Sequence, residues 1–518
     1  MPHMPHLRRI PIAAFAGTLA VASSVLAVGT PAAQADPEPC FSAGTSDLNG
    51  DGYTDAAVGD PYATVDGQVG AGRVVVMYGD ADDRVGEGAR AVLTVADLGL
   101  TPQAGAHFGW SVGIGSVDMD ACADLVVGSP GDDLPEPDAG AIHVVYGSLD
   151  GVNGGTTSEY MSQSDAGGVT EAGDLFGSTV AVGENLGQDT SVVVAGAPGE
   201  DIGAATDAGA VNIVNFSDSI PVQPRQVTQS TGGIPDGVET ADRFGTSIAL
   251  GADMLRDDGG WELLVGAPGE SVGSRAAAGS VTLVAEVQGF PPTTTWHAAR
   301  YTQDSPGVGG AAESGDQFGA RVAVGNRNIF TPGSLRRIAV GAPGEDIGSA
   351  NAAGGVNLFT ASGSGLQGLS FLSQDTPGVQ NAAEPGDRFG ASLAVMAGTT
   401  QRLAVGAPYE NIGSATDAGM VQRFDFDHLA TDSVLTQNSV GASGVVHDGA
   451  LYGSPVVAVE GGSERVFLVG NPRQGTGAVH VVSVGGGFSS RPWLPGVNGV
   501  PGGAARFGWS AGGHDDLG

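Results

Sequence analysis

A short pattern of apolar and polar residues recurs along the whole chain. Seven apolar runs end in Gly-x-Pro, successive prolines are 64 to 75 residues apart, and an aromatic-Gly pair precedes most of the runs. A period of this length fits one four-stranded supersecondary unit with its loops. The chain is therefore a repeat protein. Its runs end at Gly59, Gly128, Gly196, Gly266, Gly341, Gly406 and Gly470.

The third repeat shows which elements one unit contains. Apolar residues predict a first strand from Phe176 to Val182 and a second from Ser191 to Ala195, which stops at the proline of Gly196-Ala197-Pro198 because proline has no amide hydrogen. A third strand is expected from Ala210 to Phe216 and a fourth from Arg225 to Gln229. With 88 glycines in the chain, long helices are unfavourable.

We therefore predict an all-β fold, a seven-bladed β-propeller of four-stranded antiparallel blades, as one domain over residues 36–518. One unit cannot bury its own apolar face, so the units must pack side by side and close a ring. Two segments look like the start of a first strand, Phe41-Ser42-Ala43-Gly44 and Phe507 to Gly512. The C-terminal one is expected to pair beside Asp55–Val58, with the N-terminal one as the alternative. Closure by both termini removes two exposed sheet edges.

In an antiparallel blade, successive loops lie at opposite ends of the strands, so the loops of the propeller belong to two opposite surfaces. We call the surface formed by the loops after the second and fourth strands the long-loop face, and the opposite surface the hairpin face. Recurrent acids belong to the long loops. They either accept hydrogen bonds within their own turns or form a ring that recruits a cationic ligand. They are Glu200, Glu270, Glu345 and Glu410 after the prolines, and Asp174, Asp242, Asp316 and Asp387 before the phenylalanines.

The first hairpin carries the strongest ligand pattern of the chain. Asp47, Asn49, Asp51 and Asp55 occupy loop positions one, three, five and nine, the carbonyl of Tyr53 is at seven, and glycine is at six. Oxygen ligands at this spacing predict a bound Ca²⁺ that closes a β-hairpin. The alternative is a plain Asn-Gly/Asp-Gly turn.

The second hairpin keeps part of this pattern. It has the carboxylates of Asp118, Asp120 and Asp124 but lacks the glycine and the first acid. The sequence therefore predicts calcium there less strongly, and one or two metal ions in total.

The N-terminal residues indicate export. Arg8 and Arg9 precede an apolar stretch, and small residues precede Asp36, which predicts a signal peptide over residues 1–35. We expect a secreted, extracellular protein, free or associated with the cell wall, and no later membrane span. In an oxidising compartment Cys40 and Cys122 are expected to form a disulfide; two free buried thiols are the alternative.

The net charge of −36 limits the partners that we expect. Such a charge repels nucleic acids and anionic lipid surfaces and favours cations or basic partners. Solubility alone is also a sufficient reason for it.

A Phe-Gly pair before the first strand and Gly-Ala-Pro after the second, with a calcium hairpin between them, resembles the FG-GAP repeat of integrin α-subunit heads and related bacterial secreted proteins. The resemblance implies a seven-bladed propeller, calcium in selected blades with the residues of the first hairpin as ligands, and a ligand surface on the long-loop face. No leg domains or membrane anchor are evident, so we expect no receptor role. The paired motifs are Phe108-Gly109 with Gly128-Ser129-Pro130, Phe176-Gly177 with Gly196-Ala197-Pro198, Phe244-Gly245 with Gly266-Ala267-Pro268, Phe318-Gly319 with Gly341-Ala342-Pro343, Phe389-Gly390 with Gly406-Ala407-Pro408, and the divergent Tyr452-Gly453 with Gly470-Asn471-Pro472.

The expected function is a calcium-stabilised, monomeric, non-enzymatic module that binds a protein or glycan partner, as in adhesion. The alternative is a secreted hydrolase, an esterase or phospholipase, because Ser111 and Ser510 each stand in a Gly-x-Ser-x-Gly segment. A nucleophilic serine needs a strand-turn-helix elbow, whereas both serines lie inside a strand repeat. A structural envelope component is the third hypothesis.

Overall fold

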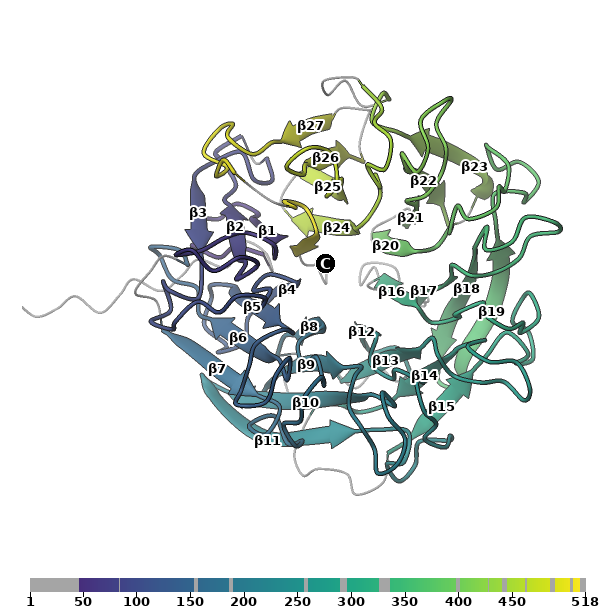
Figure 1. The fold of residues 1–518 in the computed structure, drawn as a ribbon, viewed down its shortest axis with the longest axis horizontal. Coiled ribbons are helices and arrows are strands. Elements are labelled where there is room, and N and C mark those ends of the chain that lie inside the picture. Colours follow the sequence, from purple (N-terminus) through teal and green to yellow (C-terminus); the bar gives the residue numbers. More distant parts are fainter. Residues whose placement is uncertain are drawn as a thin grey trace, which may run out of the picture. The chain divides into compact units, whose positions relative to one another are not determined.

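The computed structural model contains seven four-stranded antiparallel sheets arranged as blades around a central axis (Figure 1). The predicted all-β propeller is confirmed, and the part of the chain that the structure describes contains no helix. The predicted signal peptide and Cys40 lie outside the described residues. These are residues 46–82, 84–152, 157–185, 190–255, 260–288, 296–325, 336–396, 401–426, 428–439, 445–461, 464–484, 490–503 and 506–512.

Six blades are built from four consecutive strands, which run outward from the axis in chain order. The second, third and fourth blades contain β4 (Ser111–Gly115), β5 (Asp124–Ser129), β6 (Ala141–Val145) and β7 (Ser158–Ser162); β8 (Thr179–Gly183), β9 (Ser191–Ala197), β10 (Ala210–Ser217) and β11 (Ile220–Val227); and β12 (Ser247–Ala252), β13 (Trp261–Ala267), β14 (Ser280–Val284) and β15 (Ala298–Tyr301). The fifth, sixth and seventh contain β16 (Arg321–Gly325), β17 (Arg336–Ala342), β18 (Gly355–Ser362) and β19 (Gly365–Leu372); β20 (Ser392–Met396), β21 (Arg402–Ala407), β22 (Met420–Asp425) and β23 (His428–Leu435); and β24 (Val456–Gly461), β25 (Glu464–Gly470), β26 (Val479–Ser483) and β27 (Ser490–Trp493).

The first blade joins the two ends of the propeller. Its strand order is β28 (Ser510–Gly512), β1 (Ala56–Asp60), β2 (Arg73–Met77) and β3 (Arg90–Leu93), so the C-terminal segment supplies the innermost strand. Ala57 pairs with Gly512 and Gly59 with Ser510. The expected closure is confirmed, and it gives the first blade its fourth strand.

Two strand boundaries in the third blade differ from the sequence prediction. β8 begins three residues after Phe176, because Phe176 makes an isolated parallel bridge to Gly140 of the second blade and Gly177 has φ 86°. β11 begins five residues before Arg225 and includes two prolines. As the outermost strand it has a free edge, where a missing amide hydrogen costs no ladder bond.

The two sequence motifs pack against each other at every blade junction. The amide of each aromatic-Gly glycine donates to the carbonyl of the Gly-x-Pro glycine in its own blade, at 2.9 to 3.1 Å. Its carbonyl lies against the Gly-x-Pro glycine of the preceding blade, where an added Cβ would stand 1.9 to 2.5 Å from that oxygen in all seven junctions. Both glycines are therefore needed for close approach of neighbouring blades.

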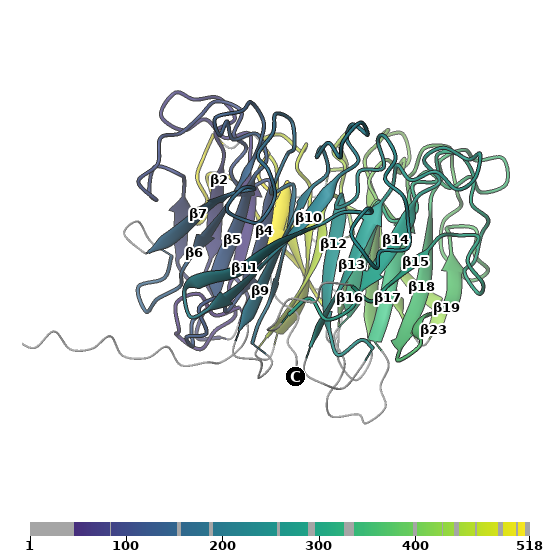
Figure 2. The ribbon, with the colours of Figure 1, turned by 90° about the horizontal axis from the view of Figure 1, so that it is seen from below.

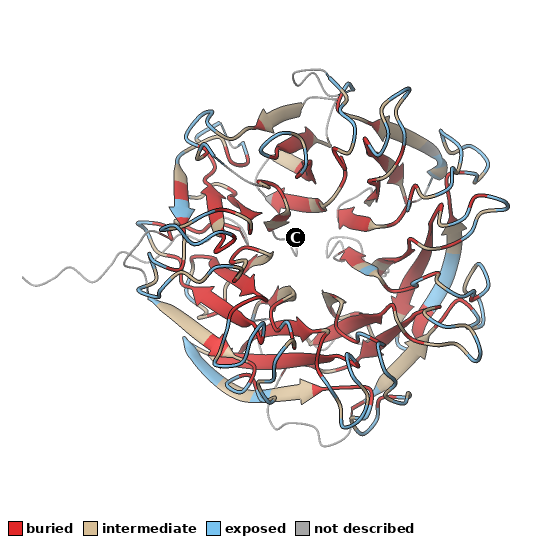
Figure 3. Ribbon diagram, in the orientation of Figure 1, coloured by how far each residue is buried: buried red, intermediate tan, exposed pale blue. Residues whose placement is uncertain are grey.

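The apolar core runs as a ring through the middle strands of the blades (Figure 3). The aromatic residue of each aromatic-Gly pair is buried between two blades: Phe108, Phe176, Phe244, Phe318, Phe389, Tyr452 and Phe507. Loops gather at the two faces of the ring (Figure 2). None of the described residues forms a helix long and apolar enough to span a membrane.

Candidate functional site

The first predicted calcium hairpin lies on the hairpin face, and its side chains converge on one turn. The carboxylate of Asp47 accepts the amides of Asp51 and Gly52 at 3.1 and 2.7 Å. Asn49 Oδ1 also accepts the Asp51 amide, at 3.2 Å. Asp55 accepts the amide of Leu48 at 2.8 Å. Hydrogen bonds therefore join Asp47, Asn49 and Asp51 in one turn, and Asp55 adjoins this turn through the amide of Leu48. The carboxylates of Asp47, Asp51 and Asp55 are not among the described groups whose oxygens all lie within 4.8 Å of one another.

Two of these carboxyl groups are buried without a countercharge. Asp47 is 1 % exposed and Asp55 is fully buried, and no ion pair among the described residues includes either one. Burial raises the pKa of Asp47, and it raises the pKa of Asp55 to about 8. A divalent cation would supply the missing positive charge, so the donor set fits Ca²⁺.

The second hairpin repeats this arrangement. The buried Asp124 accepts the amides of Val117 and Gly147, as Asp55 accepts those of Leu48 and Gly79. Burial raises the pKa of Asp124 well above its usual range. The other two predicted ligands also accept backbone amides. Asp118 accepts the amide of Asp120, and Asp120 accepts the amide of Cys122.

The two hairpins contact each other across the first blade junction. The amide of Ala123 donates to the carbonyl of Asp47 at 2.8 Å, and the amide of Ser148 donates to the carbonyl of Leu48 at 3.3 Å. The neighbouring Cys122 is buried. Its predicted partner, Cys40, lies outside the described residues, so the disulfide stays a prediction.

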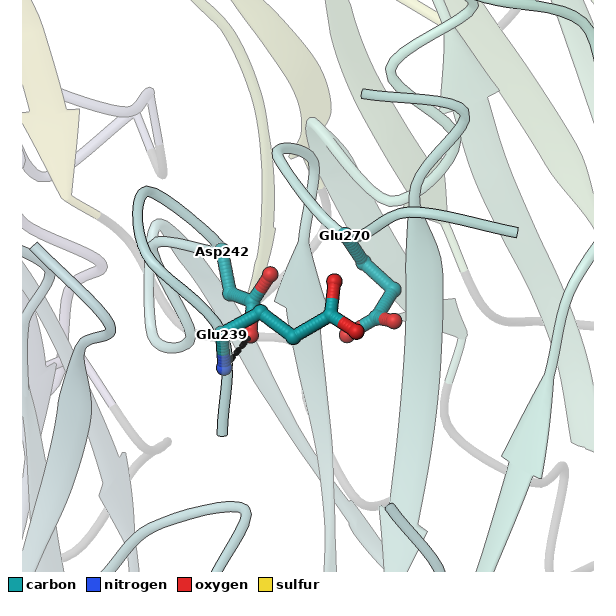
Figure 4. A group of neighbouring side chains, drawn as sticks. All are labelled: Glu239, Asp242 and Glu270. Atoms are coloured by element: carbon teal, nitrogen blue, oxygen red, sulfur yellow. Dashed lines mark hydrogen bonds between the residues drawn. The ribbon is translucent and has the colours of Figure 1, made fainter. Parts of the chain in front are cut away.

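The recurrent acids of the long loops form buried carboxyl groups rather than an exposed ring. Figure 4 shows Glu239 and Asp242 of one loop converging with Glu270 of another, and oxygen atoms of the three lie within 4.8 Å of one another. Glu384, Asp387 and Glu410 form an equivalent group. These oxygens are close enough to hold one cation, but the described side chains already give them partners.

Those partners decide between the two interpretations of the acids. Each Asp accepts the amide of the residue three positions earlier, as Asp242 accepts that of Glu239 at 2.7 Å, so the turn hypothesis is confirmed for the aspartates. The glutamates instead accept a glutamine side chain from the preceding loop; Gln229 donates to Glu270 at 2.6 Å. Arg300 also pairs with Glu270 at 2.9 Å.

Burial shifts the titration of these acids upward. It raises the pKa of Glu200, Glu345 and Asp387 to about 7 each, with neighbouring carboxylates adding to the shift. The acids thus form a buried, hydrogen-bonded network rather than a ring of surface anions.

The mouth of the central channel forms a cavity of about 540 Å³ on the long-loop face. The channel below is lined by the innermost strands and is apolar, with residues such as Val180, Val324 and Val395. Polar and aromatic residues surround the mouth, including Trp110, Trp509 and Arg321. An open cavity with mixed apolar and polar walls is the usual form of a ligand site.

An aromatic cluster borders this cavity. Trp110 and Trp509 lie 4.9 Å apart between ring centroids, Tyr62 lies 5.3 Å from Trp509, and His107 lies 4.8 Å from Tyr62. The guanidinium of Arg506 lies 4.5 Å from the Tyr62 ring. All five side chains are half-buried, so part of each is open to solvent. Sequence reasoning missed this cluster, because its members come from loops at opposite ends of the chain.

The two serines of the hydrolase pattern are hydrogen-bonded to the next blade. Ser111 Oγ donates to the carbonyl of Gly177, and Ser510 Oγ to the carbonyl of Gly109, both at 2.7 Å. Neither contacts a histidine among the described residues. His143 and His480 are buried, and burial lowers their pKa values to about 3 and about 4. The geometry gives both serines a structural role.

Comparison with known proteins agrees with this architecture. The FG-GAP repeat family matches residues 41–77 and 108–145. Two segments of this chain, in its first two repeats, therefore match the FG-GAP repeat. Together with the seven-bladed ring, the match confirms the resemblance to the integrin α-subunit propeller that the motifs indicated.

Two curated proteins and one solved structure are similar to parts of this chain. Phosphatidylinositol-glycan-specific phospholipase D of Dictyostelium discoideum is 22 % identical over 39 % of the chain and 21 % of the relative. Human integrin alpha-6 is 27 % identical over 37 % of the chain and 15 % of the relative. The match thus spans about a fifth or less of each relative. The SapL1 lectin in complex with alpha methyl fucoside is 11 % identical and aligns with a TM-score of 0.34 over 75 % of this chain and 98 % of the lectin.

Proposed function

We propose that this FG-GAP propeller is a secreted, calcium-stabilised binding module that contacts a protein or glycan partner through its long-loop face, as an adhesion protein does. Calcium in the first hairpin would be held by Asp47, Asn49, Asp51, Asp55 and the carbonyl of Tyr53, with Asp118, Asp120 and Asp124 as a second set. The ion would stiffen the hairpin face and leave the opposite face for the partner.

The distribution of exposed apolar side chains carries this proposal. Among the residues that the structure describes, six of the ten exposed large apolar side chains belong to long loops, and Val69 and Val169 are 70 % and 60 % exposed. A contiguous exposed apolar patch is typical of an interaction site, and we propose that these long-loop residues contribute to one. The six are Val69, Leu100, Val169, Leu175, Val445 and Val497.

A binding screen with matched surface variants tests the proposal. The purified protein is applied to a glycan array and to immobilised extracellular proteins in calcium, and saturable binding is expected. The double variant Val69→Glu/Val169→Glu on the long-loop face should lose it. The control Leu149→Glu/Ile220→Glu alters residues that are 43 % and 62 % exposed at the hairpin face, Leu149 in a loop and Ile220 at the start of β11, and should keep it. Absence of any saturable partner, or loss only in the control, would contradict the proposal.

A hydrolase is the second candidate, because one relative is named as a phospholipase D. The match covers 21 % of that relative. The hydrogen bonds of Ser111 and Ser510 to backbone carbonyls disfavour them as nucleophiles. Ester turnover by the purified protein that disappears in Ser111→Ala, with the fold intact, would establish the hydrolase instead.

A further inference from the structure

Arg321 interrupts a repeated contact between the innermost strands. At the equivalent position of five other blades a hydroxyl donates to the aromatic-Gly carbonyl of the next blade, and Arg321, the first residue of β16, stands where those hydroxyls stand. The side chain is exposed in the channel mouth, and no ion pair of the described residues includes it. The five hydroxyls belong to Ser111, Thr179, Ser247, Ser392 and Ser510.

An arginine without a carboxylate partner is unexpected in this chain, which has 57 acidic and 21 basic residues. An anion in the cavity would supply the countercharge that no ion pair of the described residues gives to Arg321. A planar guanidinium fits a carboxylate through two parallel hydrogen bonds.

Other cationic and aromatic groups surround the same cavity. Arg243 lines it and is exposed, and Arg506 lies beside the cluster of Trp110 and Trp509. Neither arginine is in an ion pair among the described residues. The mouth of the channel therefore concentrates positive charge in a strongly acidic protein, which would guide an anion there.

The remaining walls favour a ring with hydroxyl groups. The indole rings of Trp110 and Trp509 offer flat apolar surfaces that are half-exposed. Ser178 and Thr246 line the cavity with hydroxyls that donate to carbonyls within their own turns, so their oxygens remain free to accept. Asp207, also on the wall, can accept from ligand hydroxyls but would repel a dianion.

We propose that the channel mouth binds a carboxylate-bearing sugar, such as a uronic acid, with Arg321 on the carboxylate and Trp110 and Trp509 against the sugar ring. This inference rests on the proposed long-loop binding face and names one ligand site on it. The carboxylate is expected to select for the acidic sugar over its neutral counterpart, because only the acid compensates the charge of Arg321.

Titration with D-glucuronic acid, followed by calorimetry and tryptophan fluorescence on the full chain, tests the assignment. Glucuronic acid should bind at least 10-fold more tightly than D-glucose, and its affinity should fall as salt is raised. Benzoate, a carboxylate without sugar hydroxyls, and inorganic phosphate, an anion without a ring, are titrated in the same way for comparison. If either binds as tightly as glucuronic acid, or if glucuronic acid and glucose do not differ, the assignment is overturned.

The repeats supply variants that should preserve the fold. Arg321→Ser installs the residue of Ser247 at the same position and should lose at least 10-fold in glucuronic acid affinity with no loss of thermal stability. Trp110→Ser installs the residue of Ser178 and should also weaken binding. Unchanged affinity in both variants overturns the site. The two proposals can fail separately. If Arg321→Ser and Trp110→Ser leave glucuronic acid affinity unchanged while Val69→Glu/Val169→Glu abolishes binding of a macromolecular partner, the sugar site is wrong and the long-loop binding face is still supported.

Discussion

Ser510 Oγ, on the last strand of the chain, donates a hydrogen bond to the carbonyl of Gly109 in the second blade at 2.7 Å. The same contact recurs between Ser111 and Gly177 and between Ser247 and Gly319. The C-terminal strand β28 is therefore held to the second blade by the same hydroxyl-to-carbonyl hydrogen bond that joins other neighbouring blades.

Removal of this hydroxyl should weaken closure. Ser510→Ala leaves a buried carbonyl with one partner fewer, and we expect it to lower the free energy of unfolding by about 1 kcal/mol. The matched control is Ser178→Ala, because the Ser178 hydroxyl bonds only to Leu175 in its own exposed turn. Thermal unfolding followed by circular dichroism measures both. If both variants lower the free energy of unfolding equally, the hydrogen bond between the blades does not contribute specifically to stability.

The Gly-x-Pro glycines should tolerate no side chain. A Cβ on Gly128 would stand 1.9 Å from the carbonyl oxygen of Gly177 and 2.3 Å from Ser111 Oγ. Gly128→Ala must push two blades apart, and we expect a loss of roughly 3 kcal/mol or more. Gly232→Ala is the control, because nothing lies within 4 Å of its Cβ position. Denaturant unfolding that finds both variants alike would refute this account of the motif.

These contacts show why the fold could be predicted and the ligand site could not. Gly59 and Gly128 recur at a fixed period because every junction needs the same approach, so one repeat reveals all seven. Tyr62 and Trp509 meet only because the ring closes, and nothing repeated in the sequence relates them. The sequence did contain a signal, since Trp110 and Trp509 hold equivalent positions in two repeats, but it was attributed to a nucleophile pattern.

The hairpin acids illustrate a different limit. The spacing of Asp47, Asn49 and Asp51 predicted metal ligands, and the structure places the three in one hydrogen-bonded turn. The burial of Asp55 and Asp124 follows instead from packing against the neighbouring backbone, which local spacing does not contain. The pKa shifts of both residues therefore required the structure.

Calcium should stabilise the protein through the first hairpin. Asp51→Ala is expected to lower the melting temperature in calcium and to change it little in chelator, because a ligand that binds only the folded state stabilises by mass action, by about 2.7 kcal/mol at 100 times its Kd. Asp97→Ala is the control, since Asp97 accepts only from Thr94 in an exposed turn. Scanning calorimetry with and without calcium measures the melting temperatures of both variants. A loss for Asp51→Ala that is the same in both conditions would identify a plain turn.

Stability in chelator should fall as pH rises from about 4.5 to about 7. The pKa of Glu345 is raised to about 7 in the folded protein by burial, with neighbouring carboxylates adding to the effect. Between the unfolded and folded pKa values the folded state binds more protons than the unfolded state, so the free energy of unfolding decreases with pH. A pKa that differs by one between the two states changes this free energy by about 1.4 kcal/mol.

Glu345→Gln isolates this effect, because glutamine has nearly the shape of the protonated acid. We expect the variant to lose roughly 1–3 kcal/mol less than the wild type between pH 5 and pH 8, since one titrating group is gone. Glu136→Gln, at an exposed position, is the matched control and should follow the wild type. Urea unfolding at both pH values gives the difference. A Glu345→Gln profile parallel to the wild type would mean that this carboxyl group is ionised in the folded protein throughout the range.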